Sequence, residues 1–201
     1  MKLKGDKANN YFTNPDTNHT VILIYGADTM RVALRRQELL KALIGENAEE
    51  EMRLTRISGS DLRSDPALLL DGLKASGFFP GPRAVFVEGA TDTNSAIIDA
   101  AMQEWQKGDA VLVLTANQLN ARSKLRKMIE NKSNSIAIGI YNDPPNEKEI
   151  ISIASKYNLN NFESDAKKDL IALGRSLDPG DFHQTCEKLS LYKYKDDSVI
   201  T

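Results

Sequence analysis

The chain has a single cysteine, Cys186, among its 201 residues. One thiol excludes an intramolecular disulfide and a cysteine-rich metal centre, a usage typical of a reducing cytoplasm. Long apolar runs are absent as well: none approaches the roughly 18 residues that a membrane-spanning helix needs, and no signal-peptide segment follows the charged residues 1–7. We therefore expect a cytoplasmic protein with no membrane partner.

The chain also lacks an excess of charge of either sign. Lysine and arginine number 26 and aspartate and glutamate 28, so the formal net charge is −2. An affinity for nucleic acid that rests on a basic field over the whole molecule is therefore excluded, and any DNA contact would have to be local. Hydrophobic residues make up 41% of the sequence and charged residues 27%, which excludes disordered and collagen-like classes.

Short apolar runs alternate with amphipathic helical patterns through most of the chain. Four runs have the length and β-branching of buried strands, at residues 21–26, 84–88, 110–115 and 136–141. A fifth segment, residues 52–57, alternates apolar and polar side chains, which favours a half-exposed edge strand. Helical patterns separate them at residues 29–44, 66–77, 95–106 and 122–131, the first capped by Asp28 and the second closed by Gly77. This alternation predicts a mostly parallel five-stranded sheet covered on both faces, in a three-layer α/β domain.

The pattern changes at Pro144 and Pro145. Beyond them no strand is expected, and residues 147–157, 164–174 and 179–192 each have one apolar helical face. Three such helices predict a small bundle behind a proline linker. We therefore expect two domains, an α/β domain at residues 1–142 and a helical domain at residues 143–201.

A first strand that ends in Gly26 and runs into a helix is typical of nucleotide-binding sheets. However, the motif G-x-x-x-x-G-K-[ST] is absent, Asp28 stands where phosphate would bind, and G-x-G-x-x-G is absent too. Two carboxylates, Glu88 at the end of the third strand and Asp92 shortly after it, have no neighbouring catalytic partner in the sequence. The Cys186 and His183 pair lies on a helix whose apolar face favours a buried structural thiol. We expect no cofactor, no metal and no active site.

Basic residues are densest at Arg122, Lys124, Arg126 and Lys127, after the fourth strand. Two interpretations stay open for this cluster: a solvated helix face, or a local contact with DNA phosphate or a partner.

Two adjacent phenylalanines, Phe78 and Phe79, lie between Gly77 and a Pro-Gly-Pro turn. A turn this short and stiff hinders both rings from folding back into the core, so at least one is expected to face outward. Core packing and a protruding hydrophobic anchor for a partner protein both stay open on these grounds.

In order and spacing, the chain resembles the delta-subunit family of the bacterial DNA polymerase III clamp loader. The resembling segments are residues 1–4, 21–28, 77–85, 111–114, 124–127 and 187–192. The resemblance implies an ATPase-like α/β domain of the clamp-loader (AAA+) type without a functional phosphate loop, and then a helical lid domain. It implies no ATP hydrolysis, with Glu88 and residues 115–117 as remnants of a nucleotide site.

The same resemblance implies a role in DNA replication, as a non-catalytic part of a DNA-directed DNA polymerase (nucleotidyltransferase) holoenzyme. The clamp-binding residues would be Leu73, Gly77, Phe78 and Phe79, and the two phenylalanines would insert into a pocket of the ring-shaped sliding clamp and open it for primed DNA. The delta prime and gamma or tau subunits would bind through a collar domain that we expect to be missing, so the chain should be monomeric. The alternative is a nucleotide-dependent enzyme or regulator that uses Asp28 or Glu88 to hold a metal or ribose.

Overall fold

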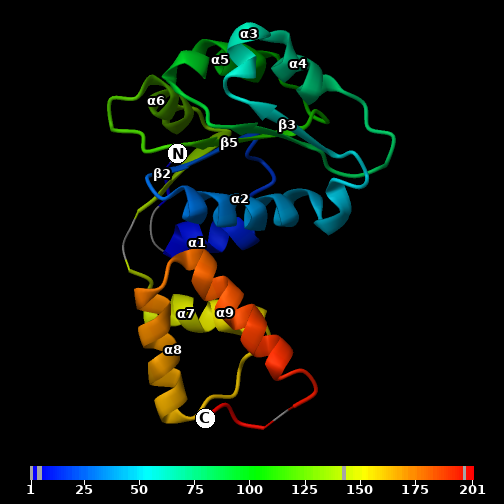
Figure 1. Ribbon diagram of the computed structural model, residues 1–201. Helices are drawn as coiled ribbons and strands as arrows, with labels where there is room; N and C mark the ends of the chain where they lie inside the picture. The colour runs from blue at the N-terminus through cyan, green and yellow to red at the C-terminus, as the bar shows by residue number, and fades with distance from the viewer. Residues whose placement is uncertain (1, 4–5, 142–143, 197) are drawn as a thin grey trace. The chain divides into compact units, whose positions relative to one another are not determined.

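The computed structural model describes residues 2–3, 6–141, 144–196 and 198–201 (Figure 1). Contacts between Cα atoms divide the chain into two compact units, residues 1–141 and 142–201. The domain boundary expected from the sequence, between residues 142 and 143, lies outside the described residues.

A parallel sheet of six strands forms the centre of the first unit. The strands are β1 (Lys2–Leu3), β2 (Val21–Gly26), β3 (Leu54–Ser58), β4 (Ala84–Glu88), β5 (Val111–Ala116) and β6 (Ser135–Ile140), in the spatial order β1-β6-β2-β5-β4-β3. The predicted α/β class and its five strands are confirmed, each within two residues of its expected bounds. The predicted number of strands is corrected to six, because β1 is too short to leave a periodic signal.

Helices cover both faces of this sheet (Figure 1). On one face lie α1 (Asp6–Thr13) and α2 (Thr29–Ile44), and on the other lie α3 (Asp61–Ser64), α4 (Ala67–Lys74), α5 (Ser95–Glu104) and α6 (Lys124–Asn131). Two short 3-10 turns, η1 (Glu46–Ala48) and η2 (Asp92–Asn94), complete the unit. The sequence pattern predicted neither α1 nor α3.

Apolar side chains of the strands alternate between the two layers. Ile22 and Ile24 of β2 point into the layer that contains Leu39 of α2, whereas Leu23 points into the layer that contains Ile98 of α5. Because successive side chains of a strand face opposite sides of the sheet, a strand covered on both faces must be apolar at every position. This explains the continuous apolar runs of the sequence.

Helix boundaries follow the capping residues in two cases. Asp28 caps α2, since its Oδ1 accepts a hydrogen bond of 2.9 Å from the Arg31 amide, and Gly45 follows the helix with φ of 84°. By contrast, α4 ends at Lys74, because Ala75 already has extended backbone angles. The prediction that Gly77 closes this helix is therefore wrong by three residues, and Gly77 belongs to the loop that follows.

In the second unit, α7 (Glu147–Lys156), α8 (Ser164–Ser176) and α9 (Pro179–Tyr192) confirm the three predicted helices. They share a core that includes Ile150, Leu170, Phe182 and Cys186. Gly174 of α8 lies so close to α7 that a Cβ atom there would come 2.9 Å from Ile150. Among the described residues, no helix is long and apolar enough to cross a membrane.

Cys186 is fully buried in this core, as the sequence predicts for a structural thiol, and burial raises the pKa of the thiol to about 11. The nearby His183 instead places Nδ1 3.0 Å from the Tyr157 hydroxyl. The thiol is neutral in both the folded and the unfolded state below its ordinary pKa of 9.0, so its titration should not change the free energy of unfolding there. The free energy of unfolding should then fall as pH rises from 9.0 to about 11.

Denaturant titrations over this pH range give the free energy of unfolding of the wild type and of Cys186→Ala. The difference between the two values isolates the effect of the thiol, because the contributions of the other titrating groups cancel. This difference should become smaller as pH rises. A thiol-reactive chromophore should label Cys186 at pH 8 only after unfolding. Rapid labelling of the folded protein would contradict the burial.

Candidate protein-binding surface

An exposed loop, residues 75–83, joins α4 to β4 and is called the aromatic loop below. Its two phenylalanines face outward: Phe78 is 91% exposed and Phe79 is 39% exposed. The rings contact each other edge to face, with their centroids 5.3 Å apart and an angle of 79° between their planes. This arrangement is favourable for aromatic pairs, so the rings form one apolar projection rather than two separate side chains.

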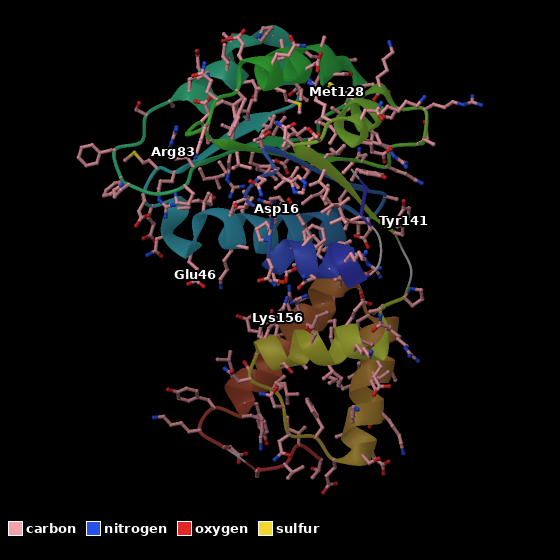
Figure 2. The ribbon with its side chains drawn as sticks, turned by 180° about the vertical axis from the view of Figure 1, so that it is seen from behind. Asp16, Glu46, Arg83, Met128, Tyr141 and Lys156 are labelled. Atoms are coloured by element: carbon pink, nitrogen blue, oxygen red, sulfur yellow. The ribbon has the colours of Figure 1, made fainter. Side chains whose placement is uncertain are left out.

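The stem of the aromatic loop is fixed on both sides. At the α4 end, Lys74 donates to the Glu104 carbonyl at 2.7 Å and pairs with Asp109 at 2.7 Å. At the β4 end, Arg83 donates to the Gly108 carbonyl at 2.9 Å. The loop projects from the body of the first unit beside Arg83 (Figure 2). The stem is therefore attached to the region between α5 and β5.

Of the other two residues expected to bind the clamp, Leu73 and Gly77, the first lies in the core. Its side chain is 1% exposed and packs in the layer between α4 and the sheet, so it cannot contact a partner directly. Gly77 lies within the loop, where a Cβ atom would come 3.1 Å from Arg83 Cδ and 3.3 Å from the Phe79 carbonyl oxygen. The absence of a Cβ atom at Gly77 thus lets Arg83 and the Phe79 carbonyl lie close to its backbone. The surface available to a partner is formed by Phe78 and Phe79.

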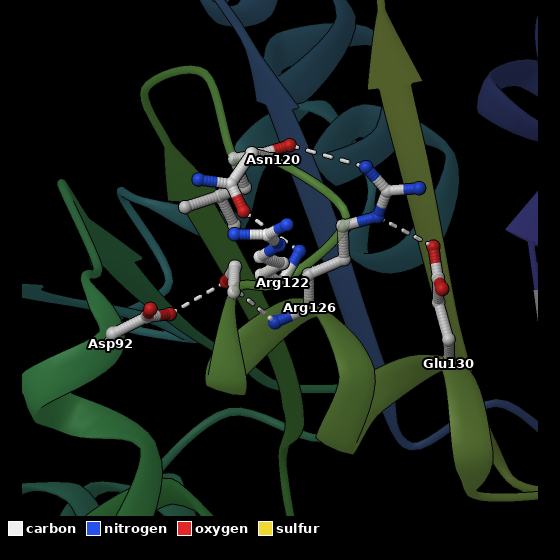
Figure 3. Close-up of polar contacts among 7 residues, drawn as sticks. Asp92, Asn120, Arg122, Arg126 and Glu130 are labelled. Carbon is white, nitrogen blue, oxygen red and sulfur yellow. Dashed lines mark hydrogen bonds and ion pairs between the residues drawn. The ribbon is translucent and has the colours of Figure 1, made fainter.

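The four basic residues after β5 differ in exposure, and Arg126 alone among them is partly buried, beside Glu130 (Figure 3). Arg126 is held inside the unit: it pairs with Glu130 at 2.8 Å, donates to the Leu119 carbonyl at 3.2 Å, and lies 5.1 Å from the ring centroid of Tyr25. The hydrogen bond to Glu130 raises the pKa of Arg126. Its contacts leave the charge little available to a partner.

The other three basic side chains, Arg122, Lys124 and Lys127, are exposed. Any local contact of this region with phosphate or with a partner protein therefore falls to these three residues.

Asp92 has a structural role that the sequence did not indicate. Its Oδ1 accepts hydrogen bonds from Ser123 Oγ at 2.6 Å and from the Leu125 amide at 3.1 Å, while Ser123 Oγ accepts from the Arg126 amide at 3.2 Å (Figure 3). The Ser123 hydroxyl lowers the pKa of the Asp92 carboxyl. Two side chains thus cap the first turn of α6 and join it to η2.

Asp92→Ala should destabilise the protein by about 1–2 kcal/mol, because it leaves the amides of α6 without their acceptor. Denaturant unfolding at pH 7 measures the loss, with Asp71→Ala, an exposed carboxylate on α4, as the control. The loss in the free energy of unfolding should stay constant as pH falls to 3.8, the ordinary pKa of the carboxyl group. It should shrink as pH falls further, because protonation of Asp92 then removes the same interaction from the wild type. Equal stability of the two variants would contradict the capping role.

A small pocket lies at the carboxyl edge of the sheet, between the first half of α2 and the ends of β4 and β5. Its lining includes Arg36, Glu88, Thr115 and Asn117, so the residues that resemble remnants of a nucleotide site do lie together. Within the described ranges, no group of three or more histidine, cysteine, aspartate or glutamate residues is placed to hold a metal ion. The nearby Asp28 carboxylate caps α2 and pairs with Arg31 at 3.2 Å, so it occupies the Arg31 amide, one of the helix amides that a phosphate would need.

Comparison with known proteins gives a match at the level of structure. No family model matches the sequence, and no curated protein matches it. The fold is similar to that of the Bacillus subtilis DNA clamp loader delta protein, with a TM-score of 0.63 and 17% sequence identity, over 97% of this chain and 59% of that protein. The chain thus spans 59% of the length of this structural relative. The resemblance drawn from the order of segments in the sequence is confirmed as a likeness of structure: this chain has the fold of a clamp loader delta protein.

Proposed function

We propose that the chain is a non-catalytic, delta-type clamp-loader subunit that binds a ring-shaped sliding clamp through Phe78 and Phe79 during DNA replication. The outward-facing aromatic pair on a fixed stem is the observation that carries the proposal. The fold, shared with a DNA clamp loader delta protein, indicates which kind of partner the pair would meet. In this view residues 1–142 are a degenerate ATPase-like domain and residues 143–201 are a lid domain.

Two exposed phenyl rings are well suited to anchor a protein interface. Burying a phenylalanine side chain is worth about 1.5–3 kcal/mol, and aromatic anchors seated in a pocket contribute much of the affinity of many interfaces. If the pocket accepts the rings only when the clamp subunit has a curvature that does not fit a closed ring, binding shifts the ring towards an open state. The shift can be no larger than the difference in affinity between the two states, so the strength of the anchor sets the limit.

Such a mechanism needs no reaction on this chain. The sequence lacks the lysine and hydroxyl of a phosphate loop, and the Asp28 carboxylate occupies the Arg31 amide in the first turn of α2. ATP hydrolysis would take place in other loader subunits, which would control when the aromatic pair is presented to the clamp. Primed DNA would be contacted indirectly, or locally through Arg122, Lys124 and Lys127.

The proposal is tested by mixing the purified chain with the sliding clamp of its source organism and following the complex by size-exclusion chromatography. Co-elution is the expected result. Calorimetry with ATP, GTP and NAD is the companion measurement, and no binding at micromolar concentrations is expected. Micromolar nucleotide binding without any clamp binding would overturn the proposal in favour of a nucleotide-dependent enzyme or regulator.

A further inference from the structure

Arg53, the residue before β3, carries a charge that is almost completely withdrawn from solvent. Its side chain is 9% exposed, although arginine is among the residues that are seldom buried without partners. Removing a charge from water is costly, so a buried arginine persists only where several hydrogen bonds compensate it. The partners of Arg53 therefore show what the residue does.

The side chain of Arg53 joins the end of α2 to the aromatic loop and pairs with the neighbouring Glu51. Nη1 donates to the Ile44 carbonyl at the end of α2, at 2.6 Å, and to the Pro82 carbonyl in the aromatic loop, at 2.8 Å. Nε donates to Glu51 at 2.7 Å and Nη2 pairs with the same carboxylate at 2.5 Å. The planar guanidinium can serve these three directions at once, which a lysine ammonium cannot reproduce with the same geometry.

The same guanidinium packs against the turn of the aromatic loop. Gly81 has φ of 129°, and a Cβ atom there would come 3.3 Å from Nη1 and 3.4 Å from Cζ of Arg53. The main chain reinforces the contact, because the Ala84 amide donates to the Arg53 carbonyl at 3.0 Å. Arg53 thus touches the loop through its side chain at Gly81 and Pro82 and holds the start of β4 through its backbone.

The aromatic loop has few other constraints on its backbone. Among the residues that the structure describes, the main chain of residues 76–82 forms no hydrogen bond to other main-chain groups, and its one side-chain hydrogen bond is the bond from Arg53 to Pro82. Without this contact the loop would sample many conformations, and a partner would have to restrict them on binding at a cost in entropy.

We infer that Arg53 is a positioning residue for the aromatic loop: it fixes the Pro82 end of the loop to α2 and β3 and so preorganises Phe78 and Phe79 for docking. This inference rests on the proposed function, since the docking partner is the sliding clamp. It adds a specific requirement, namely that the loop be held in place before the partner arrives.

The test compares Arg53→Lys with Arg56→Lys. Arg56 is the matched control, because it lies on β3, is exposed, and pairs with Glu49 rather than with the loop. Clamp affinity, NMR order parameters of the amides of residues 77–79 and 81, and the free energy of unfolding are measured for each. For Arg53→Lys we expect the loop order parameters to fall from about 0.85 to below about 0.6 and the affinity to fall on the order of tenfold. Arg56→Lys should change neither.

The local order parameters separate positioning from general stability, because a purely structural role for Arg53 would lower the free energy of unfolding without a selective change in the loop. Unchanged loop order in Arg53→Lys overturns the inference, whatever the affinity. An unchanged affinity with a disordered loop overturns it as well.

The test still decides the inference if Arg53→Lys does not fold or if the wild type does not bind the clamp. If Arg53→Lys does not fold, Gly81→Ala perturbs the same contact from the side of the loop and should lower the same order parameters. Unchanged loop order in Gly81→Ala would then overturn the inference. If the wild type fails to bind the clamp, the proposed function fails, while the order parameters still decide whether Arg53 holds the loop.

Discussion

Replacing Phe78 and Phe79 together by alanine should abolish binding to the sliding clamp. Truncating an aromatic anchor typically costs 2 kcal/mol or more, so the loss for two rings should exceed about a hundredfold in affinity. Because Phe78 is 91% exposed and Phe79 is 39% exposed, the free energy of unfolding should change little. Fluorescence anisotropy with a labelled clamp measures the affinity, and circular dichroism confirms the fold.

The matched control is a second exposed aromatic pair on the same chain. Tyr192 and Tyr194 are 84% and 72% exposed and belong to the helical unit. The double variant Tyr192→Ala with Tyr194→Ala removes a similar apolar area and should leave clamp binding unchanged. Undiminished capture of the clamp by the phenylalanine double variant would sink the assignment of the site.

The second large effect is expected at Gly26, the last residue of β2. A Cβ atom there would come 2.6 Å from the Ile140 carbonyl oxygen and 3.0 Å from Ile140 Cβ, where β2 pairs with β6. Neither strand can move aside without breaking its ladder, since β2 is paired on both edges. Gly26→Ala should therefore destabilise the protein by about 2–3 kcal/mol, as overpacking in a core does.

Denaturant unfolding of Gly26→Ala is best compared with Gly72→Ala. Gly72 lies inside α4, where a Cβ atom would meet a Val85 methyl group at 3.3 Å, a side chain that can shift. Alanine is also the better helix former by about 1 kcal/mol, so the control should lie within about 1 kcal/mol of the wild type. A Gly26→Ala protein as stable as the wild type would mean that this glycine is not needed for packing.

Gly26 also illustrates how a sequence pattern can carry two meanings. A glycine at the end of a first strand is typical of phosphate binding, yet here the close approach of β6 and of the Val32 side chain accounts for it. The strands inside the sheet were predictable because both of their faces are covered, which makes each an unbroken apolar run, whereas the edge strand β3 has exposed polar side chains. Register and strand order depend on contacts between distant residues, and β1 is too short to show a pattern.

From the sequence, at least one of the two phenylalanines was expected to face outward, and both are exposed, but their surroundings could not be predicted. Leu73 has the helical spacing of a core residue, and its burial follows from that spacing rather than from its nearness to the loop. Glu130 follows Arg126 by four residues, a spacing that indicates an ion pair within a helix. This spacing could have predicted that Arg126, unlike its basic neighbours, is paired. No comparable signal exists for Arg53, because its partners at Ile44 and Pro82 are backbone carbonyls.

The burial of Leu73 has a mechanical consequence for the proposed clamp opening. The aromatic loop begins two residues after this side chain, which is locked in the core, and it ends at β4, which is paired with β3 and β5. A load applied at the two rings would pass into a helix end and a central strand, both stiff, instead of being absorbed by a hinge at the base of the loop. The clamp ring, rather than the base of the aromatic loop, would then be the part of the complex that deforms.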